Sequence, residues 1–470
     1  MRTWTVLIVV LAALLLRAPD GLAESSAERR LRLLEDTVRK ATQEMQQLRR
    51  EMEQQKAVGA ATQKQTELAE EKAKAVETAQ KGGTDLPGWL KKVTLFGDVR
   101  FRHEGFYHQP HQQGDIVGAR NRERIRARIG AKITYSDELS AVIRIASGDI
   151  DDPISSNQTL TGSFNRKQVG IDQAYVTLTP GQSFGIRPGS VSLTAGKFPN
   201  PMFRVGEMVF DDDLMGEGFT QTFALLGQPV GALDQLKIHM LQWVFSEFSN
   251  SQDGWMIGGQ VNPTAHAGDW LFEGGIGQYW WLNADHIALD LNKNKALKNS
   301  NILEIQDANG NIRREANQFA KLGKGETVAG YAGAFNQTNL SFSVTHPTLI
   351  YGKPLRLFAD YVYNWEAFTD NAQGVQAGFK IGQPKVKGDW AVTALYEYLG
   401  QEAALSSFSY SDFGAFGGTN AQGPVLGVEY QLLDPLTISA RNHFITLIDA
   451  PNQFRNPTMF RLQLDILLKF

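Results

Sequence analysis

Apolar and polar residues alternate along the last segment of the chain. From Phe460 to Phe470 every second residue is apolar or aromatic, and most of the residues between them are polar. A membrane-crossing strand needs about 9–11 residues with this period, whereas strands of soluble sheets are usually about half as long. The pattern predicts a strand with one face toward lipid and the other toward an interior.

The same period recurs upstream, in segments at 95–102, 124–135, 141–145, 355–363, 375–381 and 390–398. Counting such segments from Val93 to Phe470 gives about 16, an even number as closed bacterial barrels have. Closure is a physical requirement, because an open sheet edge in lipid leaves backbone N–H and C=O groups unpaired. We expect an all-β transmembrane barrel of about 16 antiparallel strands over residues 93–470.

Short and long connections alternate between these segments. Those at 136–137, 384–387 and 433–435 are short, and those at 149–165, 198–217, 283–325 and 401–422 are long. Outer-membrane barrels have short periplasmic turns and long external loops. The pattern therefore places both ends of the barrel in the periplasm.

The first residues have the features of a secretory signal peptide. Arg2 is followed by an apolar run from Val6 to Leu16, and small residues stand at Gly21 and Ala23. We expect cleavage after Ala23, so the signal peptide covers residues 1–23. A transmembrane anchor is the alternative, but the apolar run is shorter than a helical span requires.

Residues 24–80 predict a periplasmic coiled-coil stalk. Heptad positions a and d are occupied by Leu31, Val38, Met45 and Met52, and by Ala27, Leu34, Ala41 and Leu48. The segment 30–35 resembles a short pattern of trimeric coiled coils in which an arginine reaches a glutamate of a neighbouring chain. The predicted trimer contacts are Arg30, Leu31, Leu34, Glu35 and Val38. Glycine and proline at 82–88 end the helix, which makes 81–92 a linker.

Composition excludes several classes of protein. The 470 residues carry a formal charge of −3, which argues against a nucleic-acid partner. A mean hydropathy of −0.28 argues against a polytopic helical membrane protein. The absence of cysteine excludes disulfides, thiolate metal sites and cysteine nucleophiles. The eight histidines form no recognisable catalytic arrangement. We therefore predict no enzyme, no cofactor and no metal site.

Basic side chains gather on one face of the first predicted strands. This arginine row consists of Arg100, Arg102, Arg122, Arg124, Arg126, Arg128 and Arg144. The tight turn at 136–137 places Arg144 opposite or diagonal to Arg128. Like charges opposed in a sheet are destabilising, so the row requires nearby acids or a use for its field. One interpretation is a pore lining that favours anions. The other is that the arginines hydrate the interior and brace a loop.

Acidic residues follow in the third external loop. If this loop folds inward, its carboxylates face the arginine row and narrow the pore to a constriction with a transverse field. The alternatives are a solvated loop and a loose calcium site, although no spacing matches a calcium loop. The predicted constriction residues are Asp211, Asp212, Asp213 and Glu217.

Several stretches resemble bacterial outer-membrane porins of the 16-stranded trimeric kind, especially the "putative porin" family. They are 95–102, 120–124, 196–201, 209–214 and the terminal Phe470. The resemblance implies a homotrimeric passive diffusion channel for small hydrophilic solutes and ions in the outer membrane, with an inward third loop. It also makes Phe470 the signal read by the barrel assembly machinery. Phosphate-selective porins usually add lysines along the path, where this chain has Lys132 and Lys380.

The expected partners are further copies of the chain, outer-membrane lipid and the barrel assembly machinery. Peptidoglycan is an additional candidate, because a helical stalk of this length spans up to ~90 Å at 1.5 Å per residue. The alternatives to a general anion-preferring porin are a phosphate or anion-selective channel, and a barrel that acts mainly as a tether between the outer membrane and the cell wall.

Overall fold

The structure is a computed structural model that describes residues 88, 90–110, 116–117, 119–249, 252–293, 299–316, 322–414, 417–450 and 458–470. The chain divides into two compact units, Met1–Gly88 and Trp89–Phe470, and almost all described residues belong to the second. The predicted signal peptide, stalk, trimer contacts and most of the linker therefore lie outside the described residues. Among the described residues, no helix is both long and apolar enough to cross a membrane.

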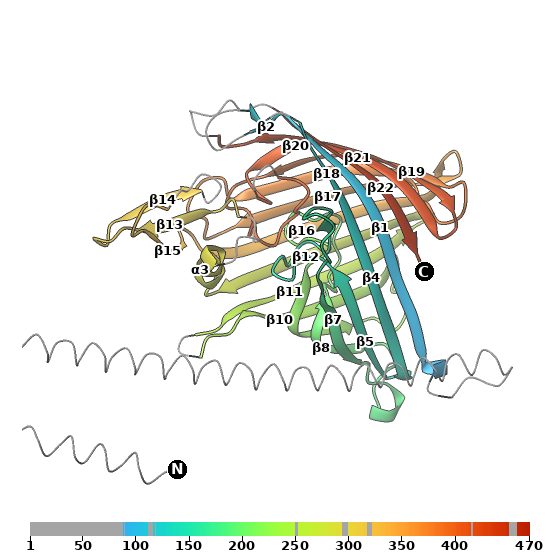
Figure 1. Ribbon diagram of the computed structural model, residues 1–470. Coiled ribbons are helices and arrows are strands. Elements are labelled where there is room, and N and C mark those ends of the chain that lie inside the picture. Colours follow the sequence, from blue (N-terminus) through green and yellow to red (C-terminus); the bar gives the residue numbers. More distant parts are fainter. Residues whose placement is uncertain are drawn as a thin grey trace, which may run out of the picture. The chain divides into compact units, whose positions relative to one another are not determined.

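Within the described part of the chain, sixteen long antiparallel strands form one closed sheet, which confirms the predicted fold class (Figure 1). These strands are β1 (Val93–Tyr107), β4 (Arg120–Ser136), β5 (Leu139–Ser147), β7 (Val169–Leu178), β8 (Val191–Pro199), β9 (Met215–Ala224), β10 (Leu233–Ser246), β11 (Gly254–Ala267), β12 (Trp270–Leu282), β16 (Phe335–Ile350), β17 (Lys353–Asn364), β18 (Gln373–Gly382), β19 (Trp390–Leu399), β20 (Ala421–Leu433), β21 (Leu436–Leu447) and β22 (Met459–Lys469).

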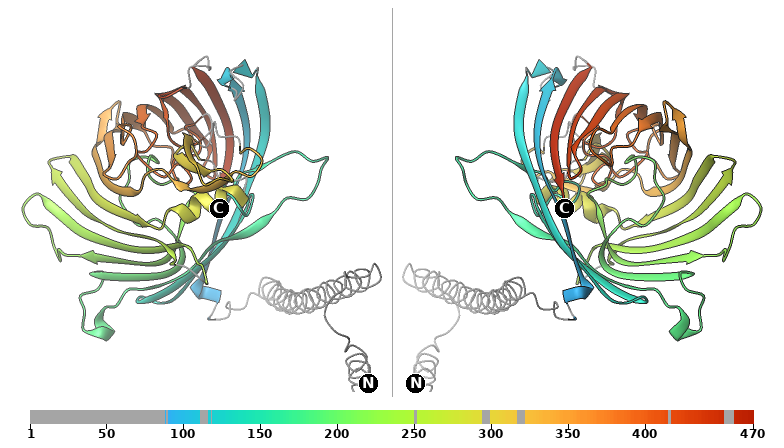
Figure 2. Two further views of the ribbon diagram at one scale, coloured as in Figure 1. Left: turned by 90° about the vertical axis from the view of Figure 1, so that its left-hand side faces the viewer. Right: turned by 90° about the vertical axis from the view of Figure 1, so that its right-hand side faces the viewer.

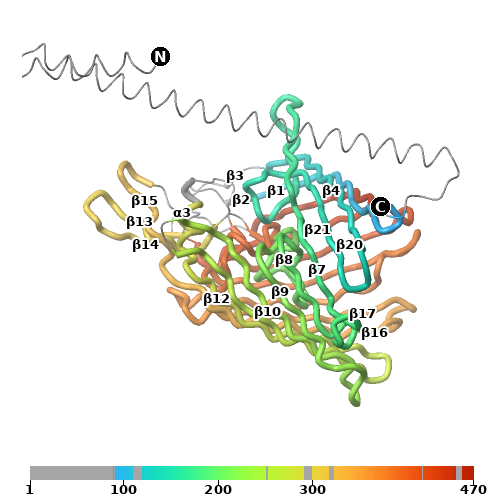
Figure 3. The backbone as a smooth tube through the Cα atoms, turned by 90° about the horizontal axis from the view of Figure 1, so that it is seen from below, coloured from blue at the N-terminus to red at the C-terminus, as the bar shows by residue number. Residues whose placement is uncertain are grey.

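Shorter elements occupy the connections. They are η1 (Leu90–Lys92), β2 (Gln109–Pro110), β3 (Ile116–Val117), β6 (Gln158–Thr159), η2 (Gln182–Phe184), α3 (Asp285–Lys293), β13 (Ile302–Gln306), β14 (Ile312–Ala316) and β15 (Thr327–Tyr331). Strands β13 to β15 form a separate small sheet that projects from one end of the barrel (Figure 3).

The barrel closes where the first strand meets the last. Strand β1 pairs with β4 on one side and with β22 on the other. Past the end of β22, Phe470 exchanges two backbone hydrogen bonds with Gly97, of 2.9 and 3.1 Å. A Cβ atom at Gly97 would overlap the Arg128 carbonyl oxygen and the Phe470 ring, so this position requires glycine. Among the described barrel strands, closure leaves none with an unpaired edge toward lipid.

Most connections at one end of the barrel are longer than those at the other. Four of the long ones are used below and are called loop 2 (148–168), loop 3 (200–214), loop 5 (283–334) and loop 7 (400–420). Turns of two residues, such as 137–138 and 434–435, lie at the opposite end. The two ends are called the long-loop end and the short-turn end.

The two faces of the wall differ in polarity. Outward residues are apolar and exposed, as at Leu95, Ile129 and Ile466, while inward positions carry arginine, carboxylate and amide groups. Connecting segments enter the barrel (Figure 2), and an apolar core forms where loops 3, 5 and 7 pack against the wall. Phe210 of loop 3 contacts the rings of Trp243, Tyr279 and Trp281 at its centre. The inward loops therefore fill part of the interior.

Candidate functional site

The arginine row lies side by side on three neighbouring strands. In the register of β1 and β4, Arg100 is opposite Arg126 and Arg102 is opposite Arg124. On β5, Arg144 is opposite Gly130, which makes it diagonal to Arg128. The arginines thus lie opposite or diagonal to one another, as the sequence pattern predicts. Such like-charged neighbours need carboxylates nearby to compensate their repulsion.

Carboxylates on these strands and on their neighbours β7 and β22 separate these charges. Asp98 accepts hydrogen bonds from Arg126 at 2.8 Å and from Arg128 at 2.7 Å. Asp465 of β22 accepts two bonds from Arg102, of 2.7 and 2.8 Å. Charge-assisted bonds of this kind are stronger than neutral ones. Glu104 accepts hydrogen bonds from both Arg122 and Arg461, and Asp172 accepts one from Arg144.

Loops 2, 3 and 7 contact the arginine row from inside the barrel. Asn157 of loop 2 accepts a hydrogen bond from Arg100 at 2.5 Å. Asp213 of loop 3 lies 3.2 Å from Arg128. Asp412 of loop 7 lies 3.0 Å from Arg102. The side chains of the row are between 6% and 18% exposed, so the loops cover them.

Loop 3 crosses the interior and pairs with loop 7. The backbone N–H of Asp211 donates to the carbonyl of Phe408 at 2.8 Å, and the N–H of Tyr410 donates to that of Glu207 at 3.0 Å. The Asp211 carboxylate accepts a bond from the Ser411 N–H at 2.9 Å. These contacts form the loop 3–loop 7 clasp, which fixes how far loop 3 extends into the barrel.

The four predicted constriction acids have different surroundings. Asp213 contacts the arginine row, while Asp212 pairs with Arg204 of its own loop at 2.9 Å. Asp211 belongs to the clasp. Glu217 is not a loop residue: it lies on β9 and pairs with Lys197 of β8 at 2.5 Å. Of these four carboxylates, Asp213 is the one for which the described residues include a contact with the arginine row, and Glu217 lies on the strand because β9 begins already at Met215.

Burial and neighbouring charges shift the pKa values of the loop carboxylates in opposite directions. Burial, together with Asp213, raises the pKa of Asp211 to about 8. Burial also raises the pKa of Glu207 well above its usual value, and Asp211 and Asp212 add to the effect. Burial raises the pKa of Asp213, but Arg126, Arg128 and the hydrogen bonds from Ser156 together lower it below its usual value. The clasp thus contains one carboxyl group, that of Asp211, whose neutral form is favoured at pH 7.

A cavity of about 360 Å³ separates loop 3 from the inner face of β17 to β21. We call it the basic chamber. Its described lining has the basic residues Arg204, Arg356, Lys380 and Arg441 and the acids Glu207, Asp212 and Glu429. Lys380 and Glu429 pair at 2.7 Å, and Arg441 donates to the Tyr410 hydroxyl at 3.2 Å. Of these residues, Lys380 and Asp212 were singled out from the sequence, whereas the others were not, because the path of loop 3 decides which strand residues line the cavity.

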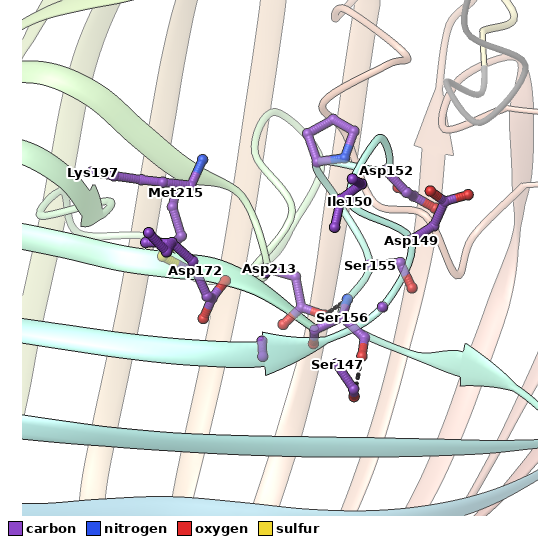
Figure 4. Close-up of a pocket in the computed structure, with 15 residues that line it drawn as sticks. Ser147, Asp149, Ile150, Asp152, Ser155, Ser156, Asp172, Lys197, Asp213 and Met215 are labelled. Atoms are coloured by element: carbon purple, nitrogen blue, oxygen red, sulfur yellow. Dashed lines mark hydrogen bonds between the residues drawn. The ribbon is translucent and has the colours of Figure 1, made fainter. Parts of the chain in front are cut away.

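A smaller cavity of about 100 Å³ lies between loop 2 and strands β5, β7 and β8. Figure 4 shows Asp213 directed at Ser156, whose N–H and hydroxyl groups donate to it at 3.1 and 3.0 Å. Four carboxylates line this cavity, yet the described residues include no cluster suited to a metal ion. The two hydrogen bonds from Ser156 to Asp213 attach loop 2 to loop 3.

A closed 16-stranded barrel with an apolar outer face and inward loops defines a β-barrel channel of the outer membrane. The chain belongs to the family described as "Putative porin", which matches residues 113–291 and 292–470. It is accordingly an outer-membrane porin. Comparison with curated proteins gives no match.

Solved structures show distant similarity. The high-pH structure of Pseudomonas putida OprB is 11% identical, with a TM-score of 0.49 over 81% of this chain and 94% of that one. Salmonella typhi OmpF in complex with daunomycin is 10% identical, with a TM-score of 0.45 over 80% and 97%. A loop-deletion mutant of Vibrio cholerae OmpT is 9% identical, with a TM-score of 0.43 over 80% and 99%.

Proposed function

We propose that this porin is a passive diffusion channel for small hydrophilic solutes and ions, and that it prefers anions. The basic chamber carries the proposal. Four basic and three acidic side chains line its described part, and burial raises the pKa of Glu207, which favours its neutral form. The net charge of this lining is therefore positive, and a positive lining in a narrow aqueous passage favours anions.

The arginine row has a different part in this proposal. Its charges are compensated by carboxylates within hydrogen-bond distance, and its side chains are largely covered. We therefore assign it the bracing of loops 2, 3 and 7, which was one of the two interpretations of the sequence. Anion preference then depends mainly on the chamber residues. Selectivity for phosphate is the second candidate, because arginine presents a fork of donors that matches phosphate oxygens.

Assembly and location extend the proposal to the N-terminal segment. The long-loop end faces the cell exterior, and the stalk lies in the periplasm, where it holds three copies of the chain together. Phe470 is recognised by the barrel assembly machinery, and the outward apolar face contacts lipid. A tether to peptidoglycan is a further role of the stalk, since a helix of 24–80 is long enough to extend toward the cell wall.

The test is the reversal potential of the purified protein in a planar bilayer under a chloride salt gradient, repeated with phosphate. We expect stepwise conductance and anion preference. Lys380→Gln with Arg441→Gln should shift the potential toward cations, and Arg126→Ala with Arg128→Ala should shift it less. A larger shift of the reversal potential in the Arg126 and Arg128 double variant would show that the arginine row determines the selectivity. Correctly folded barrels without conductance would overturn the proposal that the protein is a diffusion channel.

A further inference from the structure

A groove lies on the outer wall of the barrel, across β10, β11, β12 and β16, which are neighbours in the sheet (Figure 1). Its volume is about 510 Å³, within the range of about 300–1,000 Å³ that ligand pockets have. Gly259 lies in register with Met240 on one side and with Gln278 on the other. Because glycine has no side chain, the wall is recessed between these two residues. We call this feature the outer groove.

The polarity of the outer groove changes along the direction of the strands. From the middle of the wall toward the short-turn end it is apolar, and its outward residues Val261 and Ile276 are 40% and 59% exposed. Toward the long-loop end it carries Gln242, Gln278 and Thr338. The described lining contains no aspartate, glutamate, lysine or arginine, so its polar end is uncharged. A lipid in the leaflet at the long-loop end has the same order, with chains toward the midplane and polar groups toward the loops.

The polar end is a network of neutral hydrogen-bonding groups. The Gln242 oxygen accepts from the amide of Gln221 at 2.8 Å. The Gln278 oxygen accepts from the Thr338 hydroxyl at 2.5 Å, and that hydroxyl accepts from the indole N–H of Trp365 at 2.8 Å. No described residue accepts from the NH2 group of Gln242, which therefore retains two donors for a ligand.

These amides lie within the lipid-facing part of the wall. Trp270 and Trp280 stand near the two ends of β12, on the same outward face as Gln278. Barrels carry aromatic residues at both membrane interfaces, so Gln278 lies inside this girdle, two residues from Trp280. A polar group in an apolar environment is costly unless it is hydrogen-bonded. Contact with hydrocarbon alone would leave the donors of Gln242 unpaired, which indicates a ligand with acceptors.

We propose that the outer groove binds one lipid of the outer leaflet whose acyl chains are amide-linked and hydroxylated, as in lipid A. A chain lies along the apolar part of the groove, and its amide and hydroxyl groups bond to Gln242 and Gln278. A phospholipid chain is ester-linked and has no hydroxyl group, so it matches fewer of these groups. A second copy of the chain is the competing occupant, but contact between proteins does not require polarity to change along the membrane normal. This inference rests on the proposed orientation of the barrel, with the long-loop end facing the cell exterior.

The experiment is native mass spectrometry of the full-length protein in detergent with equal amounts of diphosphoryl lipid A and cardiolipin. Cardiolipin matches the two phosphates and multiple chains of lipid A, but its chains are ester-linked and carry no hydroxyl groups. We expect lipid A to be retained in preference. Gln278→Leu should lower the ratio of retained lipid A to cardiolipin about two- to tenfold, the effect of one lost hydrogen bond. Asn442→Leu is the matched control, since it removes an outward amide beside the exposed Leu426, outside the groove.

Two further variants keep the test informative if Gln278→Leu does not fold. Val261→Trp fills the apolar part of the groove from an outward position and should lower the same ratio. Because the chain has no cysteine, Ile257→Cys places a single thiol in the groove. Equal retention of the two lipids, or a ratio that the groove variants leave unchanged, would overturn the inference. Cross-linking of two copies through Ile257→Cys would show that protein covers the groove and would also overturn it.

Conductance of the same preparation separates this inference from the proposed channel. Preference for lipid A without conductance would support the outer groove and reject the diffusion channel. Conductance without preference for lipid A would reject the outer groove and leave the channel in place.

Discussion

The carboxylate of Asp412 lies between two guanidinium groups, 2.6 Å from Arg461 and 3.0 Å from Arg102. These arginines stand on β22 and β1, the strands that close the barrel. Both side chains are almost fully buried, and they lower the pKa of Asp412 well below its usual value even though burial raises it. Asp412 thus connects loop 7 to β1 and β22, the two strands that close the barrel.

Asp412→Asn should release loop 7 and destabilise the protein. Removal of one partner from a buried ion pair costs about 3–5 kcal/mol, because the other charges remain buried without compensation. We expect a lower melting temperature and a larger, noisier single-channel current. Asp234→Asn is the matched control, since it alters the more exposed pair with His266. Equal melting temperatures for the two variants would contradict the role of Asp412.

The strands could be predicted from the sequence, whereas the paths of the loops could not. Alternation identifies the face on which Arg126 and Arg128 lie, because a strand has a period of two. The same period places Asp98 on the face of segment 95–102 that carries Arg100 and Arg102. Asp412 could not be assigned, because it lies in a loop without period and contacts a residue 49 positions away. The position of such a residue depends on the packing of loops 3 and 7 inside the barrel.

Asp98→Asn should change the ion selectivity, although Asp98 is not among the described residues that line the basic chamber. The Asp98 carboxylate accepts bonds from both Arg126 and Arg128, so its neutralisation leaves two buried cations with less compensation. We expect a stronger anion preference in the reversal potential and a lower melting temperature. Asp389→Asn, in a turn at the short-turn end, is the control for loss of one surface charge. An unchanged reversal potential would exclude any contribution of the arginine row to the pore field.

Asp211 should make the stability of the clasp depend on pH. Its pKa in the folded protein is about 8, above the ordinary value of about 3.9. The folded state therefore retains a proton that the unfolded state releases, and stability falls as the pH rises from about 4 to 8. An asparagine side chain does not titrate, so Asp211→Asn should gain melting temperature relative to wild type between pH 5 and pH 9. Parallel curves for the two proteins would contradict the assignment.

Deletion of residues 24–80 tests the role of the stalk in assembly. The heptad seam predicts that the three barrels are held together by the coiled coil. We expect the deleted protein to retain folded barrels but to lose its trimeric mass in detergent, measured by light scattering. Binding to isolated cell wall should also be lost. A trimer that survives the deletion would place the contacts on the barrel, and unchanged attachment to cell wall would remove the tether.

Gly97 and Phe470 offer a test of barrel closure. Gly97→Val places a side chain against the Arg128 carbonyl oxygen and the Phe470 ring. Because the first overlap is with backbone, neither strand can yield by a side-chain rotation. We expect most of the heat-modifiable folded form to be lost on electrophoresis. Phe470→Ala removes only the ring, so it should reduce membrane assembly but leave barrels that fold in detergent.

The double variant separates the two effects. If backbone overlap prevents closure, Phe470→Ala does not rescue Gly97→Val, and the pair behaves like the single glycine variant. Gly427→Ala is the matched control, since a Cβ atom there meets nothing closer than 3.7 Å. Rescue by Phe470→Ala would instead show that the terminal ring, rather than the approach of β1 to β4, requires a glycine at this position.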